Sequence, residues 1–116
     1  MTGIVFFRTA DLAETVEFYT DRVGADVWLE QPGCTILEYD NLLVGFCERE
    51  EVDREGIVTL AVDDRETVDE LHEQLADRAR EQPRENETYD IYQFFAEDPD
   101  GRTLEVQTFL HETPDI

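Results

Sequence analysis

Few side chains in this sequence could do chemistry. The 116 residues include no serine, so a serine nucleophile is excluded. The two cysteines, Cys34 and Cys47, are not spaced like the ligands of a zinc knuckle. His72 and His111 are the only histidines, so one chain cannot build a three-histidine metal site. Among the many carboxylates, Glu105 becomes the leading candidate once the strand that carries it is placed.

The charge of the chain limits its partners. Its 30 acidic and 9 basic residues, all of the latter arginine, give a net charge of −21 at pH 7. Nucleic acids bind proteins through cations that meet phosphates, so a nucleic-acid partner is excluded and an anionic membrane is disfavoured. No apolar run could span a bilayer and no signal peptide is visible. We interpret the acidity as a shell adapted to high salt, similar to that of halophilic cytoplasmic proteins, and expect a cytoplasmic location.

The first half of the chain predicts a strand, a helix and three further strands. Asp11 begins the helix in a capping-box spacing with Glu14, and Gly24 ends it. The apolar and alternating patterns predict strands over 3–9, 25–31, 34–39 and 42–48. A two-residue hairpin turn at 40–41 would place each residue i opposite residue 81 − i.

This register places Cys34 opposite Cys47. A disulfide between them is sterically conceivable. We nevertheless expect two reduced cysteines in the core, because a reducing cytosol keeps thiols free.

The second half of the chain repeats the first. Residues 62–71 align with residues 10–19 at an offset of 52 and share Glu-Thr-Val. Asp63 is expected to begin the second helix, with strands over 57–62, 91–97 and 103–109 and a short edge strand within 80–88. The fold class is therefore α+β, with two tandem βαβββ modules at about 3–48 and 56–109 in a single domain over 1–116.

Three motifs resemble those of the vicinal-oxygen-chelate superfamily, which includes glyoxalase, bleomycin-resistance proteins and extradiol dioxygenases. The motifs are D-L-x-x-T-x-x-F-Y at 11–19, I-V-T-L-A-V-D at 57–63 and E-D-P-D-G-x-x-L-E-V at 97–106. The resemblance implies a cupped mixed sheet around a cavity, with the helices outside. It also implies a homodimer.

The resemblance further implies four strand positions for the ligands of a divalent metal. Counted from the motifs, these positions fall on Gly3, near Gly45, on Ile57 and on Glu105. Only Glu105 has a side chain that can coordinate a metal ion. We therefore expect no metal cofactor, unless Glu105 is joined by ligands that this count misses.

Strand alternation predicts which residues line the cup. If the four positions face inward, their neighbours two residues away face inward too. The predicted ligand-binding residues are Val5, Phe7, Cys47, Ile57, Thr59, Thr103, Glu105 and Gln107.

Glu105 is the candidate catalytic residue, as a general base, or an acceptor for a cationic or hydrogen-bonding ligand. Alternatively, it is a structural residue that pairs with Arg8 or Arg102 or faces solvent. Three functions remain open: a binding protein for a small organic molecule, a metal-dependent lyase, isomerase or dioxygenase of the glyoxalase type, and a scaffold with a vestigial cavity. The missing ligands favour the first.

Overall fold

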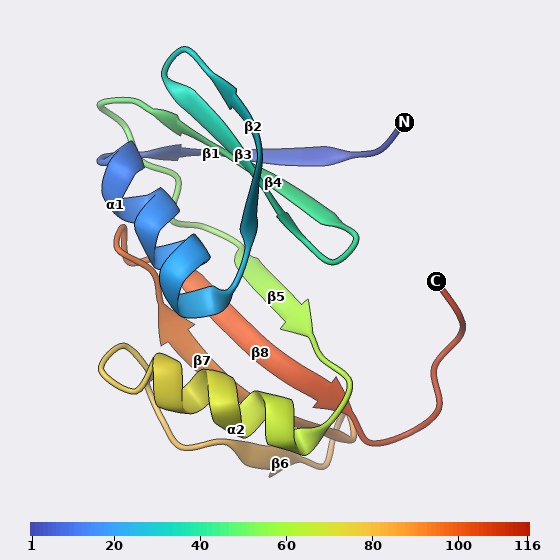
Figure 1. Cartoon of the computed structure of the whole chain (residues 1–116). Helices are drawn as coiled ribbons and strands as arrows, with labels where there is room; N and C mark the ends of the chain where they lie inside the picture. Colours follow the sequence, from blue (N-terminus) through green and yellow to red (C-terminus); the bar gives the residue numbers. More distant parts are fainter. The chain divides into compact units, whose positions relative to one another are not determined.

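A computed structural model describes all residues, 1–116. The chain divides into two compact units, residues 1–55 with 98–102 and residues 56–97 with 103–116. Each unit contains one four-stranded sheet and a helical segment after its first strand (Figure 1). The predicted α+β class and the two βαβββ modules are confirmed. No helix in the structure is both long enough and apolar enough to cross a membrane.

The first unit follows the predicted element order closely. Its elements are β1 (Ile4–Thr9), α1 (Leu12–Glu17), the π-helix η1 (Phe18–Val23), β2 (Asp26–Gln31), β3 (Cys34–Tyr39) and β4 (Leu42–Glu48). The sheet order is β1-β4-β3-β2, and β1 runs parallel to β4. Asp11 caps α1 by accepting a hydrogen bond from the Glu14 amide at 3.0 Å. Gly24 ends η1 with a φ of 96°, a left-handed conformation that glycine adopts without strain.

The second unit repeats this topology. Its elements are β5 (Ile57–Ala61), α2 (Arg65–Gln74), β6 (Arg84–Asn86), β7 (Ile91–Glu97) and β8 (Thr103–Phe109), in the sheet order β5-β8-β7-β6. The residue that caps α2 is Asp64, which accepts a hydrogen bond from the Thr67 amide at 2.8 Å. The predicted start at Asp63 is therefore wrong by one residue. The structural offset between the two caps, Asp11 and Asp64, is 53 and not 52.

Each sheet packs one face against its own helix, which we call the helix face, and the opposite side is the far face. On the helix face of the second sheet, Phe94, Leu104 and Val106 are fully buried together with Val68 and Leu75 of the α2 region. On the helix face of the first sheet, Phe46 is fully buried and stacks on Tyr19 of η1 with ring centroids 5.0 Å apart. The apolar cores thus lie between helix and sheet, which leaves the far faces for other roles.

The Asp-Pro-Asp-Gly turn between β7 and β8 is part of the first unit, and it explains the most specific sequence motif. Asp98 Oδ1 accepts hydrogen bonds from the amides of Asp100 and Arg102, both at 3.0 Å, which closes the turn. The other carboxylate oxygen of Asp98 accepts the Tyr19 hydroxyl at 2.8 Å. Burial, together with the negative charge of Asp98, raises the pKa of Tyr19 well above its ordinary value.

The hairpin of β3 and β4 has the predicted register, since Cys34 pairs with Cys47 and Tyr39 with Leu42. The two cysteines form a disulfide with Cα atoms 4.1 Å apart. The expectation of two reduced cysteines is therefore wrong for this structure. The cause is the register itself, because directly opposed residues in an antiparallel pair lie within disulfide range.

Candidate functional site

The predicted inward face of β1 is wrong. Strand β1 pairs with β4 in parallel, with Phe6 opposite Gly45 and Phe7 opposite Phe46. A Cβ atom on Gly45 would lie 2.4 Å from the Phe6 ring, so Phe6 covers Gly45 on the far face. Phe7 stacks on Phe46 on the helix face, with ring centroids 6.0 Å apart.

Val5 and Phe7 therefore do not line the far face of the first sheet. The physical reason is strand periodicity: a shift of one residue in the assumed start turns every side chain to the opposite side. Ile4 and Phe6 occupy the far face instead. Cys47 does lie on the side of Gly45 as expected, but its sulfur is bonded to Cys34.

In the second unit, the predicted residues do share one face. Strand β5 pairs with β8 in parallel, with Ile57 opposite Thr103 and Thr59 opposite Glu105. Gln107 follows Glu105 by two residues on the same strand and pairs with Ala61. Since paired residues point to the same side of a sheet, all five predicted residues of this unit lie on its far face.

Glu105 is the centre of a hydrogen-bond network on this face. Only 8% of the residue is exposed. The Thr59 hydroxyl donates to Glu105 Oε1 at 2.9 Å, and the Gln93 amide nitrogen donates to Oε2. The Asn86 amide in turn donates to Gln93 Oε1 at 2.8 Å, which fixes the orientation of Gln93.

The alternative in which Glu105 pairs with an arginine is wrong. Arg102 forms its ion pairs with Asp98 and Asp100, while Arg8 pairs with Glu51 and Asp53. The partners of Glu105 are neutral donors. A carboxyl group has about four acceptor positions and two are used here, so Glu105 can still accept hydrogen bonds from a ligand.

A pocket of about 420 Å³ opens over this network, entirely within the second unit. Its aromatic wall comes from Tyr89, Phe95 and Phe109. Its polar lining comes from Arg84, Asn86, Gln93, Glu105 and Gln107, and Ile91 completes it. A mostly apolar concavity with a few converging polar groups is typical of a small-molecule site.

Of the predicted ligand-binding residues, only Glu105 and Gln107 line this pocket. Ile57, Thr59 and Thr103 lie on the same face, and Thr59 acts through its bond to Glu105. Val5, Phe7 and Cys47 belong to the first unit and do not line it.

Sequence reasoning missed the residues that β6 and β7 contribute. The signal for β7 was available, because the Asp-Pro-Asp-Gly hairpin pairs Glu97 with Thr103 and so places Phe95 opposite Glu105. The same alternation brings Gln93 and Ile91 to this face. No comparable signal marks Asn86, which lies on a strand of three residues.

The family and the fold are matched by known proteins. Residues 3–106 match the protein family described as the Glyoxalase/Bleomycin resistance protein/Dioxygenase superfamily. The chain belongs to this superfamily. No curated protein matches the chain.

Solved structures of superfamily members resemble the chain at low sequence identity. A glyoxalase/bleomycin resistance protein/dioxygenase family enzyme from Burkholderia phytofirmans PsJN is 20% identical with a TM-score of 0.80, over 92% of this chain and 97% of that one. A glyoxalase/bleomycin resistance protein/dioxygenase from Nocardioides is 18% identical with a TM-score of 0.77, over 100% and 88%. A lactoylglutathione lyase from Agrobacterium tumefaciens is 18% identical with a TM-score of 0.75, over 93% and 92%. At these identities the likeness concerns the fold.

The residues of this superfamily member do not fit the divalent metal that the resemblance implies. Because the caps are offset by 53, Ile57 corresponds to Ile4, and the strand registers make Gly45 the counterpart of Glu105. The first of the four positions is therefore Ile4 and not the predicted Gly3. Of Ile4, Gly45, Ile57 and Glu105, only Glu105 has a side chain that can coordinate a metal ion. No group of three or more His, Cys, Asp and Glu side chains is arranged to hold a metal ion. Hard cations need several converging oxygen or imidazole ligands, and here one carboxyl group stands among amides and a hydroxyl.

Proposed function

We propose that this superfamily member is a small-molecule-binding protein that holds its ligand over Glu105 without a metal ion. The observation that carries the proposal is the buried Glu105 carboxyl group at a pocket with an aromatic wall, held by neutral donors and by no cation. The chemistry best suited to such a site is a planar organic ligand with cationic or N–H donor groups. Such a ligand would supply the charge or the hydrogen bonds that Glu105 lacks.

Each part of the network has a distinct role in this proposal. Thr59 and Gln93 each occupy one oxygen of Glu105 and so fix the plane of the carboxyl group. Asn86 fixes Gln93 from the short strand β6. Phe95 and Phe109 offer ring surfaces on which a planar ligand can stack. A site built on paired strands with a locked acceptor binds with little loss of side-chain freedom.

Titration with benzamidine, a planar aromatic cation, tests the proposal. We expect saturable shifts of amide NMR signals in β6, β7 and β8, and binding weaker by more than roughly tenfold in Glu105→Gln, because a charge-assisted bond is lost. Glu70→Gln, on the exposed side of α2, removes the same charge elsewhere and should bind like the wild type. Equal affinity in Glu105→Gln and the wild type would remove Glu105 from the site.

Elemental analysis of the same proteins separates this proposal from a metal-dependent enzyme. The chain should be purified without a tag, because its strongly acidic surface collects cations loosely. We expect no stoichiometric transition metal in either protein. One ion per chain that is lost in Glu105→Gln would contradict the proposal and favour a lyase, isomerase or dioxygenase.

We also infer that the protein acts as a homodimer and does not bind nucleic acid or membranes. The edge strand β2 supports the dimer, since all six of its residues are exposed, including Val27, Trp28 and Leu29. Exposed apolar side chains on an unpaired strand edge favour association. Light scattering coupled to size-exclusion chromatography should give twice the mass of the 13.5 kDa chain.

A further inference from the structure

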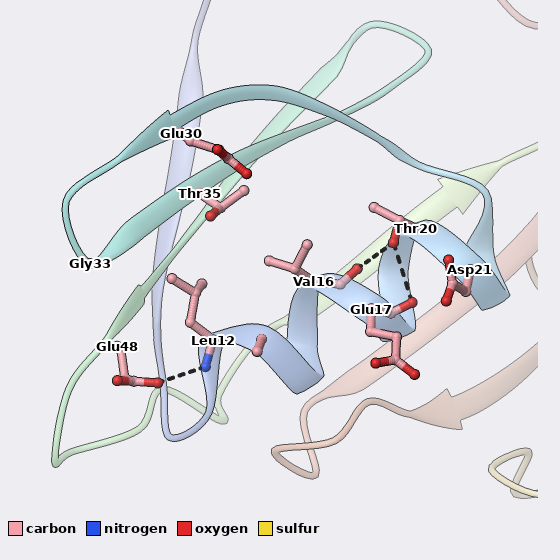
Figure 2. Close-up of a pocket in the computed structure, with 10 residues that line it drawn as sticks. Leu12, Val16, Glu17, Thr20, Asp21, Glu30, Gly33, Thr35 and Glu48 are labelled. Atoms are coloured by element: carbon pink, nitrogen blue, oxygen red, sulfur yellow. Dashed lines mark hydrogen bonds between the residues drawn. The ribbon is translucent and has the colours of Figure 1, made fainter.

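A second pocket, of about 590 Å³, lies within the first unit between α1 with η1 and the hairpin of β2 and β3. It shares no residue with the Glu105 pocket. Figure 2 shows Leu12 and Val16 reaching from α1 toward the hairpin, where Glu30 and Thr35 lie side by side. Leu12, Ala13 and Val16 give this pocket an apolar floor on the helix side.

The charged residues of this pocket all have the same sign. Glu17, Asp21, Glu30 and Glu48 line it, and no basic residue does. Glu48 has a local partner, since its Oε1 accepts the Leu12 amide at 3.0 Å (Figure 2). The Glu30 carboxylate has no hydrogen bond or ion pair, although Glu30 stands opposite Thr35 in the register of β2 and β3. The lining of the pocket therefore combines four carboxylates with an apolar floor, and the nearby Arg49 is hydrogen-bonded to the Glu48 carbonyl and to none of these carboxylates.

Thr35 provides an independent sign of a ligand. The residue is only 7% exposed, yet its hydroxyl group makes no hydrogen bond to the protein. Every side-chain oxygen that is inaccessible to solvent has a hydrogen-bond partner in this structure. The unpaired Thr35 hydroxyl must therefore be accessible, and it opens into the pocket that Thr35 lines. The side chain is thus held in a nearly buried position with a free hydroxyl group at the pocket surface. A ligand in the pocket can donate a hydrogen bond to this oxygen.

The helix that forms one wall is itself irregular. After six α-helical residues the chain continues as the π-helix η1, in which the Thr20 hydroxyl donates to the Val16 carbonyl at 2.8 Å. Thr20 and Asp21 of this segment line the pocket. Single π-helical turns are rare and occur frequently at functional sites.

We propose that this pocket is a second binding site and that it takes a primary alkylammonium compound. The ammonium group donates to the Thr35 hydroxyl and lies between the Glu30 and Glu48 carboxylates. The alkyl chain lies on Leu12, Ala13 and Val16. An ammonium ion has three donors and no acceptor, which matches a pocket whose acceptors are carboxylates and a hydroxyl oxygen. A metal ion would not use the apolar floor and would need more converging oxygens.

Titration with hexylammonium chloride, with 1-hexanol as the neutral counterpart, tests this site directly. We expect hexylammonium to shift amide NMR signals of residues 12–21, 30–35 and 48, saturably and at about 0.1 M ionic strength, where distant surface charges are largely screened. 1-Hexanol should shift them far less at the same concentration. Equal binding of the two probes would overturn the proposal, because the carboxylates would then contribute nothing.

Three variants decide which groups hold the ammonium ion. Thr35→Val keeps the shape of the side chain and breaks no bond within the protein, and it should weaken hexylammonium binding roughly threefold to tenfold. Glu30→Gln should weaken it roughly twofold to fivefold, as expected for a partly exposed charge pair. Glu14→Gln removes the same charge from α1 outside the pocket and should leave binding unchanged.

The controls keep the outcome unambiguous. Dispersed amide spectra that overlay those of the wild type outside the pocket show that each variant is folded. If Glu14→Gln weakens binding as much as Glu30→Gln, the general negative field of the protein attracts the cation and the site does not exist. Shifts confined to β6, β7 and β8 would likewise overturn this proposal, while leaving that for the Glu105 pocket intact.

Discussion

At the scale of single residues, Arg102 connects the Asp-Pro-Asp-Gly turn to the core of the first unit. Its guanidinium group is fully buried and lies over the rings of Phe7 and Phe46, 4.8 Å and 5.2 Å from their centroids. It pairs with Asp98 at 2.5 Å and donates to the carbonyls of Asp53 and Arg8 at 2.8 Å and 3.0 Å. Each nitrogen of the guanidinium group therefore donates to an acceptor of the protein.

Arg102→Met should destabilise the protein by about 3–5 kcal/mol, because it leaves the Asp98 carboxylate buried without its cation. The loss is measurable as a lower midpoint in chemical denaturation. Arg49→Gln is the matched control, since Arg49 is exposed and its side chain donates only to the Glu48 carbonyl. Similar midpoints for the two variants would show that the buried ion pair does not stabilise the fold.

Asp53 gives the protein one acid-sensitive contact. Its hydrogen bonds to the Arg8 side chain and amide lower the pKa of Asp53 from 3.8 to about 2. Because the pKa of Asp53 is lower in the folded than in the unfolded protein, this contact stabilises the fold fully at a pH above the pKa of the unfolded state. The stabilisation is lost as the pH falls through the pKa of the folded state. The wild type should thus melt at a higher temperature than Asp53→Asn at pH 7. This difference in Tm should decline as the pH is lowered from about 4 toward 2. A difference that does not change over this range would contradict the assignment.

At the scale of elements, the disulfide ties β3 to β4 at the open end of their hairpin. The two cysteines are 13 residues apart in sequence, and closing a loop of this size stabilises a fold by up to about 3 kcal/mol. The double variant Cys34→Ala/Cys47→Ala should therefore melt at a lower temperature than the oxidised wild type.

Reductant provides the control for this prediction. It should lower the Tm of the wild type and leave that of the double variant unchanged. Rapid reaction of both cysteines with a thiol reagent, in folded protein purified without reductant, would show that the disulfide does not form.

At the scale of the whole molecule, the net charge of −21 makes the fold sensitive to salt. Repulsion among surface carboxylates destabilises the compact state and is screened as the Debye length shrinks. We expect the thermal unfolding midpoint to rise as NaCl is raised from about 0.1 M to 3 M. The secondary structure measured by circular dichroism should increase over the same range. The effect should be much smaller near the isoelectric point of about 4.1, where the net charge vanishes. A fold indifferent to salt at pH 7 would count against a salt-adapted shell.

The sequence by itself determined the elements and much of their pairing. The 34–39, 42–48, 91–97 and 103–109 strands match the structure to the residue, because turn residues at each end restrict where a strand can stop. The register that places Cys34 opposite Cys47 followed from a two-residue turn alone. Glu105 was singled out because the motif at 97–106 places it a fixed number of residues after the Asp-Pro-Asp-Gly turn.

Only the tertiary structure decided which side chains of β1 point to the helix face and which to the far face. It also decided which residues surround Glu105. The alternation of side chains divides a strand into two faces but does not say which face packs against the helix. An error of one residue therefore placed Phe7 on the far face, where the structure has Phe6. The network through Gln93 and Asn86 and the pocket around Thr35 depend on residues brought together from separate elements. Local patterns in a sequence report neighbours along the chain, whereas a binding site is made by packing between segments that are distant in it.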